Sequence, residues 1–443
     1  AALLAEEPVR LEVEAGDATW LSGIAFAEDA EHSIRITDRS VEPDDHELVL
    51  HPPTLALGVG CERGTPSDEL IALVRATMAA EVLAPGSIAC VASLDLKADE
   101  KAVHDLAADL GVPARFFSAH ELEAQAPRLA TPSEVVYAET GCHGVAEGAA
   151  LAMAGPEAEL IVPKVKGKRA TMAVCRAPRA IDPAQAGRPR GRLFVVGIGP
   201  GTPQWRSPEA SAALALSTDL VGYGLYLDLL GNAAHGKTRH ESALGAEEAR
   251  AAMALDLAAE GRSVSLVCSG DPGIYALATL VFELLDHRKR ADWNRVEIVV
   301  VPGISALQAA AARAGAPVNH DFCTISLSDL LTPWESIEAR LKAAAAADFV
   351  VCFYNPVSQR RRDQLPRARD ILLTGRPPQT PVILARQLGR PGESVEIITL
   401  AELDPDKVDM LTMVVVGSSD TRCVTAGQQT WVYTPRGYGK KMI

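Results

Sequence analysis

Three apolar stretches in the second half of the chain each end in a glycine-rich turn, and this repeated pattern most constrains the possible folds. The stretches are residues 193–198, 263–268 and 296–301, which have the length and composition of buried strands. Each is followed by glycine and proline, and then by a segment that can open a helix. Because the carboxyl ends of parallel strands meet at one edge of a sheet, the turns should gather where α/β folds bind ligands. The sequence therefore predicts an α/β fold with ligand-facing turns.

The first of these turns, at 197–201, reads Gly-Ile-Gly-Pro-Gly. Glycine is favoured where the backbone needs a positive φ or lies close to a bound molecule, and Pro200 stiffens the bend. The spacing does not match the Gly-x-Gly-x-x-Gly fingerprint, and no acidic residue follows at the required distance on a second strand. The turn therefore argues against a nicotinamide-dependent dehydrogenase. By itself it fits a ligand-facing turn and an ordinary tight turn equally well.

The other two turns add polar groups to the same edge. They read Ser-Gly-Asp-Pro-Gly-Ile-Tyr over 269–275 and Pro-Gly-Ile-Ser-Ala over 302–306. Asp271 can accept a hydrogen bond from a ligand hydroxyl or ammonium group, or it is an ordinary turn aspartate before proline. Ser305 and Ala306 stand where a helix should begin, and the first N–H groups of a helix are free to meet a ligand. Together the turns favour a binding site.

Six motifs in this half of the chain resemble those of the tetrapyrrole methylases, which use S-adenosylmethionine in cobalamin and sirohaem synthesis. Within that family they are most similar to the precorrin-3B C(17)-methyltransferases. The motifs are GIGPG at 197–201, GYGLY at 222–226, SGDPGIY at 269–275, PGISA at 302–306, FYNP at 353–356 and LARQLG at 384–389. The resemblance implies a two-lobed class III methyltransferase, with an N-lobe at 192–321 and a C-lobe of mixed sheet at 322–443.

The resemblance also implies that S-adenosyl-L-methionine is the cofactor, held between the lobes beside a trough for the tetrapyrrole. From the matching motifs we assign eleven residues to cofactor binding: Gly199, Pro200, Gly270, Asp271, Ile274, Ser305, Ala306, Leu327, Tyr354, Ala385 and Arg386. Methyl transfer from a sulfonium is an in-line displacement, which needs positioning and exclusion of water but no metal and no covalent residue.

An arginine run follows the FYNP motif and is our candidate for substrate binding. Precorrins carry many acetate and propionate groups, and arginine binds carboxylates through two parallel hydrogen bonds. We therefore assign Arg360, Arg361 and Arg362, together with Tyr223, to the tetrapyrrole. The alternative is that the arginines form an ordinary solvated helix face.

The function implied by the resemblance is methylation of precorrin-3B at C-17 with ring contraction to precorrin-4, in cobalamin biosynthesis. The cobalt-factor III reaction of the anaerobic branch remains an alternative, because the same motifs serve both branches. The ring contraction calls for a base, which the sequence does not identify. The resemblance further implies a homodimer formed through the methyltransferase domain.

Residues 54–176 form a separate α/β unit in the sequence. Apolar strands at 55–60 and 87–91 alternate with two helices. The first helix should begin with a capping box at 65–68, and the second should end at Gly111. We expect Phe116 and Val135 to begin further strand units. The region resembles the C-terminal domain of the CbiG cobalamin-biosynthesis proteins and the CobE proteins, through GVGCERG at 58–64, SLDLKADE at 93–100, FF at 116–117 with EL at 121–122, TG at 140–141 with VAE at 145–147, and Lys164.

The resemblance implies a hydrolase-like domain that acts on a cobalt-precorrin, or one that carries precorrins. Glu147 is the candidate catalytic residue here, as a general base for lactone opening. The alternative is that Glu147 only charges the first turn of a helix. Cys142 and His143 are adjacent on a turn, so their side chains should point apart, which disfavours covalent catalysis.

Two further segments complete the predicted organisation. Residues 1–53 are acidic, with 13 acidic and 3 basic side chains up to residue 56, and should be the tail of a preceding domain like the middle region of CbiG. The chain opens without methionine, so we expect further residues upstream. Residues 177–191 have the composition of a linker.

The composition of the chain limits the kinds of ligand and partner that it is expected to bind. The formal net charge of −14 disfavours nucleic-acid binding, and no run approaches the roughly 18 apolar residues that a membrane span needs. Eight scattered cysteines without a Cys-x-x-Cys pair are typical of reduced thiols rather than a metal site. With no export signal in the sequence, we expect a cytoplasmic protein that binds a small molecule.

Overall fold

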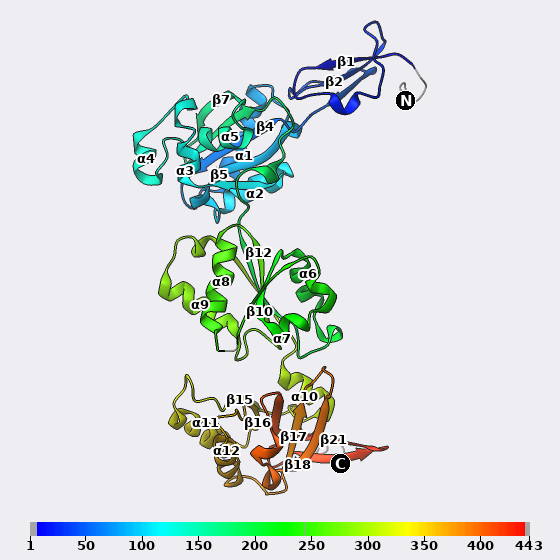
Figure 1. Ribbon diagram of the computed structural model, residues 1–443, viewed down its shortest axis with the longest axis vertical. Helices are drawn as coiled ribbons and strands as arrows, with labels where there is room; N and C mark the ends of the chain where they lie inside the picture. The colour runs from blue at the N-terminus through cyan, green and yellow to red at the C-terminus, as the bar shows by residue number, and fades with distance from the viewer. Residues whose placement is uncertain (1–6, 244, 439–443) are drawn as a thin grey trace. The chain divides into compact units, whose positions relative to one another are not determined.

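The computed structural model describes residues 7–243 and 245–438, which form five sheets and their covering helices (Figure 1). The chain folds as two compact units. The first contains residues 1–192 with the short segments 257–262 and 290–297, and the second contains the rest. Residues 1–6 of the predicted acidic segment and 439–443 of the predicted C-lobe lie outside the described residues. None of the described helices combines the length and the apolar composition that a membrane span requires.

A small parallel sheet begins the first unit. Its strands are β1 (Val9–Val13), β2 (His32–Ile36) and β3 (Glu47–Leu50), in that order. Its core is minor, with four buried residues that include Ile34 and Ile36. Asp38, 2% exposed, accepts hydrogen bonds from the guanidinium group of Arg176. This buried ion pair ties the segment after β2 to the end of the next sheet.

The second sheet of this unit has the order β6-β5-β4-β8-β7. Strands β4 (Leu55–Cys61), β5 (Ile88–Leu94) and β6 (Ala114–Phe117) are parallel, whereas β8 (Ala170–Arg176) and β7 (Glu159–Lys166) are antiparallel to their neighbours. Alternate residues of β4 face opposite layers. One face packs on α1 (Ser67–Ala80) and α2 (Lys101–Leu110), and the other packs on α5 (Val145–Ala154).

Two local expectations for this region are wrong. Val135–Tyr137 is not a strand but part of α4 (Glu134–Thr140), because the hydroxyl of Ser133 accepts the N–H of Val136 and caps a helix there. The predicted capping box at 65–68 does not form either. The Thr65 hydroxyl instead donates to the Glu62 carbonyl at 2.8 Å, and Pro66 precedes the first turn of α1 without a side-chain cap. The helix end at Gly111 is confirmed by its φ of 67°.

The segment 177–191 makes more contacts than a free linker would. The backbones of Arg188 and Phe116 exchange two hydrogen bonds of 2.8 Å, and Arg115 donates to the carbonyls of Ala184, Ala186 and Gly187. The segment up to Arg188 is therefore attached to β6, even though it has no apolar periodicity.

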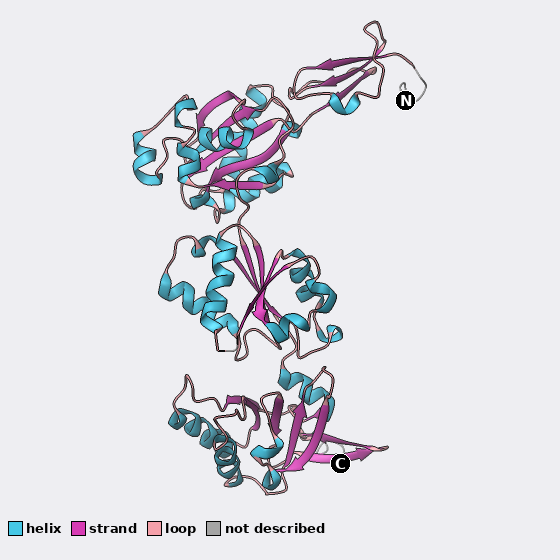
Figure 2. Ribbon diagram, viewed as in Figure 1, coloured by secondary structure: helices cyan, strands magenta, loops and turns pink. Residues whose placement is uncertain are grey.

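The second unit begins with a five-stranded sheet of order β11-β10-β12-β9-β13. Figure 2 shows helices on both of its faces. The strands are β9 (Arg192–Gly197), β10 (Asp219–Tyr223), β11 (Thr238–Ser242), β12 (Ser263–Cys268) and β13 (Glu297–Val301), and the helices are α6 (Pro208–Leu216), α7 (Gly224–Asp228), α8 (Glu247–Ala259) and α9 (Leu277–Arg288). Strand β9 lies between β12 and β13, so the three predicted glycine turns come from neighbouring strands.

A mixed sheet of order β15-β16-β19-β17-β18 follows, as the sequence predicts. Its strands are β15 (Phe322–Ser326), β16 (Val350–Tyr354), β17 (Pro381–Arg386), β18 (Ser394–Thr399) and β19 (Thr412–Val416), and only β15 and β16 pair in parallel. Helices α11 (Trp334–Ala346) and α12 (Gln364–Leu373) pack on one face and α10 (Ala306–Ala314) packs on the other. The hairpin of β20 (Arg422–Ala426) and β21 (Gln429–Tyr433) joins the short β14 (Gly315–Ala316).

Candidate functional site

The turns after β9 and β12 are joined directly by their backbones. The N–H of Gly270 donates to the carbonyl of Gly199 at 2.9 Å, and the N–H of Gly199 donates back to Gly270 at 3.2 Å. Both glycines have positive φ, 76° and 73°, a conformation that other residues rarely adopt. The two turns therefore form one rigid backbone pair.

The turn after β13 packs against this pair so closely that side chains are excluded. A Cβ atom on Gly303 would lie 2.2 Å from the carbonyl oxygen of Gly270, and one on Gly197 would lie 2.6 Å from the same atom. These two glycines are thus explained by the packing of turn on turn, without a ligand. For Gly197, this packing favours the alternative of an ordinary tight turn.

Asp271 ties the second turn to the third. One carboxylate oxygen accepts the N–H of Gly273 at 2.8 Å, and the other accepts the N–H of Gly303 at 3.1 Å. Each oxygen keeps a further lone pair for a ligand. Asp271 therefore acts at least as a structural tie within the site.

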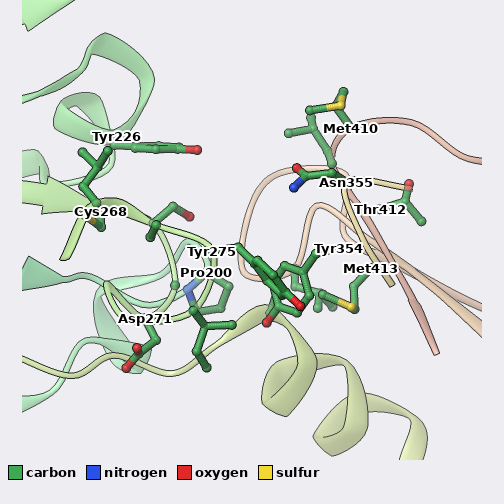
Figure 3. A pocket seen from close by; sticks show the side chains of 18 of the residues that line it. Pro200, Tyr226, Cys268, Asp271, Tyr275, Tyr354, Asn355, Met410, Thr412 and Met413 are labelled. Carbon is green, nitrogen blue, oxygen red and sulfur yellow. The ribbon is translucent and has the colours of Figure 1, made fainter. Parts of the chain in front are cut away.

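A cavity of about 300 Å³ opens beside these turns, at the lower end of the usual size for small-molecule sites. Figure 3 shows Tyr226 and Cys268 on one side of it and Met410, Asn355 and Thr412 on the other. The lining is drawn from the two five-stranded sheets of the second unit and their helices: Pro200, Tyr226, Glu247, Arg250, Val267 to Asp271, Ile274 to Leu277, Ala306, Tyr354, Asn355, Ala385, Gln387, Leu388, Arg390 and Met410 to Met413. None of the described residues of the first unit lines it.

The structure brings seven of the eleven proposed cofactor residues to the cavity wall: Pro200, Gly270, Asp271, Ile274, Ala306, Tyr354 and Ala385. The other four lie behind it. Gly199 pairs with Gly270, and Ser305 caps α10 by accepting the N–H of Gln308. Leu327 is fully buried, and its N–H donates to the carbonyl of Tyr354.

Arg386, the fourth, supports the wall indirectly. Its guanidinium Nε lies 2.6 Å from a carboxylate oxygen of Asp409. Asp409 in turn accepts the N–H of Leu411 and the hydroxyl of Thr412. Arg386 thus positions the turn that carries Met410 to Met413 to the cavity.

The arginine run is not gathered at the cavity. Arg361 donates to the carbonyls of Leu327 and Asn355 at 2.6 and 2.8 Å, and its side chain is 10% exposed. Arg362 pairs with Asp406 at 2.5 Å, whereas Arg360 is exposed and has no partner among the described residues. Within this run of three arginines, only Arg360 therefore has a side chain without a partner among the described residues. Tyr223 does not line the cavity but packs edge-on against Tyr226, with ring centroids 5.4 Å apart.

Three lining residues have backbones in the left-handed region, which is unusual for residues other than glycine. Tyr275, Asn355 and Gln387 have φ of 51°, 49° and 51°. Such strain persists only where the surrounding structure imposes it, and it gathers at functional sites. Here the Tyr275 hydroxyl donates to the Thr324 carbonyl at 3.0 Å, and the Asn355 amide donates to the Ser326 hydroxyl at 3.1 Å. Both contacts fix strained residues to β15.

Two aromatic rings form a wall of the cavity. The rings of Tyr275 and Tyr354 lie with centroids 5.0 Å apart. The Tyr354 hydroxyl is buried near Ser305 and the N–H of Leu307, but it has no partner with hydrogen-bond geometry among the described residues. Burial raises the pKa of this hydroxyl, so it stays protonated and can donate.

Sequence reasoning missed several lining residues that come from single positions rather than motifs. Arg250 is on α8, and Arg390 follows the LARQLG motif by one residue. Arg390 donates from Nε to the Pro200 carbonyl at 2.8 Å and from Nη2 to the Ser269 hydroxyl at 2.9 Å. The only signal available in the sequence was the position of Arg390 beside a motif.

Glu147 lies in the first unit, in the first turn of α5, and is 1% exposed. Its carboxylate accepts four hydrogen bonds of 2.8 to 3.0 Å, from the N–H groups of Ala130, Thr131 and Lys164 and from the Thr131 hydroxyl. Burial raises the pKa of this carboxyl, but the backbone donors outweigh burial and hold the pKa below its usual range. A carboxylate engaged in this way favours a structural role over that of a general base.

The neighbouring cysteine and histidine do not meet. Cys142 is fully buried, and burial raises the pKa of its thiol. His143 instead stacks on Tyr137 and places Nδ1 2.9 Å from the Glu123 carboxylate. Among the described residues, no group of three or more His, Cys, Asp or Glu side chains is placed to hold a metal ion.

Comparison with known proteins accounts for both halves of the chain. The family model for tetrapyrrole (corrin/porphyrin) methylases matches residues 192–404. A precorrin-3B C(17)-methyltransferase from Sinorhizobium sp is 46% identical over 249 residues, which cover 56% of this chain and 97% of that relative. The chain belongs to the tetrapyrrole methylase family. The resemblance inferred from the motifs is thereby confirmed.

The methylase region also matches a solved structure. The methyltransferase CobJ aligns with a TM-score of 0.52 and 43% identity, over 55% of this chain and all of that one. This confirms the predicted class III methylase fold. A second family model, the cobalamin synthesis G C-terminus, matches residues 55–175, so a CbiG-like region precedes the methylase region.

Other relatives are longer than the matched region. The cobalamin biosynthesis protein CobIJ of Mycobacterium tuberculosis (strain H37Rv) is 44% identical over 252 residues, which cover 56% of this chain and 48% of that relative. The chain therefore spans about half the length of such curated relatives.

Proposed function

We propose that the methylase region transfers a methyl group from S-adenosylmethionine to C-17 of a precorrin, converting precorrin-3B to precorrin-4 with ring contraction. The observation that carries this proposal is the cavity, which is built by the turns after β9, β12 and β13 and closed by residues of β17 and β19. All of its lining residues from Pro200 to Arg390 lie within residues 192–404, which the tetrapyrrole methylase family model matches. The cobalt-factor III complex is the alternative acceptor.

The cavity residues suit S-adenosylmethionine. The faces of Tyr275 and Tyr354 can attract a sulfonium cation, as aromatic rings attract other cations. The unpaired Tyr354 hydroxyl and the remaining lone pairs of Asp271 can meet polar groups of the nucleoside or the amino acid. Helix α10 begins at Ala306 on the cavity wall, and its first N–H groups have no acceptor within the helix.

The chain itself then has to position and enclose the reactants. S-Adenosylmethionine, when bound, supplies the electrophilic methyl group. The backbone pair of Gly199 and Gly270, held to the third turn by Asp271, fixes one wall. The turn stabilised by Arg386 and Asp409 presents Met410 and Met413 on the other, where apolar side chains exclude water. Pre-set geometry of this kind is what an in-line displacement requires.

S-Adenosylhomocysteine should bind the full chain with one site per chain, because the described cavity occurs once in the methylase region. Isothermal titration calorimetry measures the stoichiometry directly. Absence of binding, or binding that competes with a nicotinamide dinucleotide, would remove the proposed cofactor.

Replacing Asp271 with alanine should weaken S-adenosylhomocysteine binding by about 1 to 3 kcal/mol, because the N–H groups of Gly273 and Gly303 lose their acceptors. Asp271→Asn keeps one acceptor oxygen and should lose less. Asp370→Ala, at an exposed position on α12, is the control. Unchanged affinity in Asp271→Ala would return this residue to the role of an ordinary turn aspartate.

We further propose that residues 55–175 serve a different step of cobalamin biosynthesis, either as a hydrolase-like domain or as a precorrin carrier. The lining of the cavity supports this division, since it includes no residue of that region. We also infer a cytoplasmic homodimer. All eight cysteines are unpaired, which suits a reducing compartment, and every residue of β20 is exposed and available to a partner.

A further inference from the structure

One buried and one partly buried arginine line the cavity without a carboxylate partner among the described residues. Arg250 is 4% exposed, and Arg390 is partly buried. Neither guanidinium group lies within 4.0 Å of an aspartate or glutamate among the described residues, whereas most other arginines of the chain do form such pairs. A buried cation is costly to keep without an anionic partner.

Both guanidinium groups are held in place by neutral acceptors. Arg250 donates from Nε to the Ser242 hydroxyl at 2.6 Å and from Nη2 to the Ala243 carbonyl at 2.8 Å. Arg390 makes the two bonds to Pro200 and Ser269 described above. A guanidinium group has five N–H donors, so each arginine retains donors that these contacts do not use.

The carboxylates that line the same cavity are engaged elsewhere. Asp271 accepts from Gly273 and Gly303, and Glu247 accepts the N–H of Gly245 at 3.2 Å. Neither acidic side chain neutralises an arginine. The charge of Arg250 and Arg390 is therefore left for a ligand.

The two arginines act on the same part of the cavity. Burial raises the pKa of the Tyr226 hydroxyl, and the nearby guanidinium groups of Arg390 and Arg250 both oppose that rise. Figure 3 shows the Tyr226 side chain reaching into the cavity on the side of Cys268. Tyr226 thus lies within the electrostatic reach of both cations, next to the apolar end of β12.

We propose that Arg250 and Arg390 form a carboxylate-binding subsite of this cavity, with the Tyr226 hydroxyl as a third donor. Arginine forks match a carboxylate in both charge and geometry. The inference rests on the proposed function, which offers two sources of a carboxylate: the amino-acid end of the cofactor, and an acetate or propionate side chain of the tetrapyrrole.

Double-mutant cycles between protein and ligand test this subsite on the full chain. In one arm, S-adenosylhomocysteine is compared with S-adenosyl-3-thiopropylamine, which lacks only the carboxylate. In the other, uroporphyrin, with eight carboxylates, is compared with coproporphyrin, with four. Each ligand is titrated into wild type, Arg250→Gln, Arg390→Gln and Arg250→Lys. Lys342→Gln, which removes a surface cation of α11, is the matched control.

We expect Arg250→Gln and Arg390→Gln to lose about 10-fold or more in affinity for the ligand that supplies the carboxylate. The partner ligand that lacks the group should lose little, and Arg250→Lys should recover part of the loss. If only the two adenosyl ligands respond differently to the substitutions, the bound carboxylate belongs to the cofactor. If only the two porphyrins respond differently, it belongs to the tetrapyrrole.

Equal losses for both ligands of each pair would show that the arginines only hold the loops together, and would overturn the subsite. No loss in either arm would overturn it as well. A wild-type chain that binds neither S-adenosylhomocysteine nor its decarboxylated analogue would contradict the proposed function itself. If the wild-type chain binds both ligands, and the substitutions weaken both equally, only the subsite is contradicted.

Discussion

Gly303→Ala should abolish S-adenosylhomocysteine binding and lower the free energy of unfolding of the second unit by about 3 kcal/mol or more. The added Cβ would lie 2.2 Å from the Gly270 carbonyl oxygen and 2.8 Å from the backbone of Gly197. Both neighbours are backbone atoms, so no side-chain rotation can relieve the overlap, and the turns must move apart. Separation of the turns would also break the hydrogen bond from Gly303 to Asp271.

Gly273→Ala is the matched control, because it adds the same methyl group to the same set of turns. Its Cβ would meet only a carboxylate oxygen of Asp271, at 3.3 Å, and a small side-chain shift relieves that contact. Urea unfolding and calorimetry on both variants should separate them clearly. Equal stability and equal affinity in the two variants would contradict the close packing of the three turns.

Glu147→Ala should be the most damaging single change to a side chain in the CbiG-like region, with a loss of about 3 kcal/mol or more. It leaves three N–H groups and one hydroxyl without their acceptor in a buried setting. Glu157→Ala, an exposed glutamate that follows α5, is the control. Urea unfolding of the full chain, followed by a probe in the first unit, provides the measurement. Wild-type stability in Glu147→Ala would refute the structural role.

The same carboxylate should make stability depend on pH. Its pKa is lower in the folded chain than in the unfolded chain, so its contribution is complete above the unfolded pKa and is lost as the pH falls through the folded value. The loss should therefore begin only below about pH 4.3, the ordinary pKa of glutamate. Glu147→Gln should flatten this part of the pH profile. An unchanged profile would show that other groups cause the acid lability.

The sequence predicted those parts of the site that come from the repeated pattern of an apolar strand followed by a glycine turn. The glycine turns after β9, β12 and β13 follow apolar strands, and strand order brings them together as expected for an α/β sheet. The sequence could not show which glycines face a ligand. Gly197 and Gly303 are explained by turn-on-turn packing, a contact between residues about 100 positions apart.

Single residues brought to the site by tertiary structure were not predicted. Arg250 has no motif around it, and it lines the cavity from α8, where it donates to Ser242 and Ala243 at the end of β11. Conversely, the arginine run looked suited to carboxylates, but Arg361 satisfies the carbonyls at the ends of β15 and β16 instead. The strand predicted at Val135 is also wrong. Two adjacent valines favour a strand, but the Ser133 cap begins helix α4 there.

Methyl transfer measured on the full chain tests the central claim most directly. The chain is incubated with S-adenosylmethionine carrying an isotopically labelled methyl group, and with precorrin-3B or cobalt-factor III in parallel. The proposed function predicts one labelled methyl group at C-17 of one of these acceptors, formed together with an equal amount of S-adenosylhomocysteine and reduced strongly in Gly303→Ala. A chain that binds S-adenosylhomocysteine but methylates neither acceptor, or labels a different ring carbon, would contradict it.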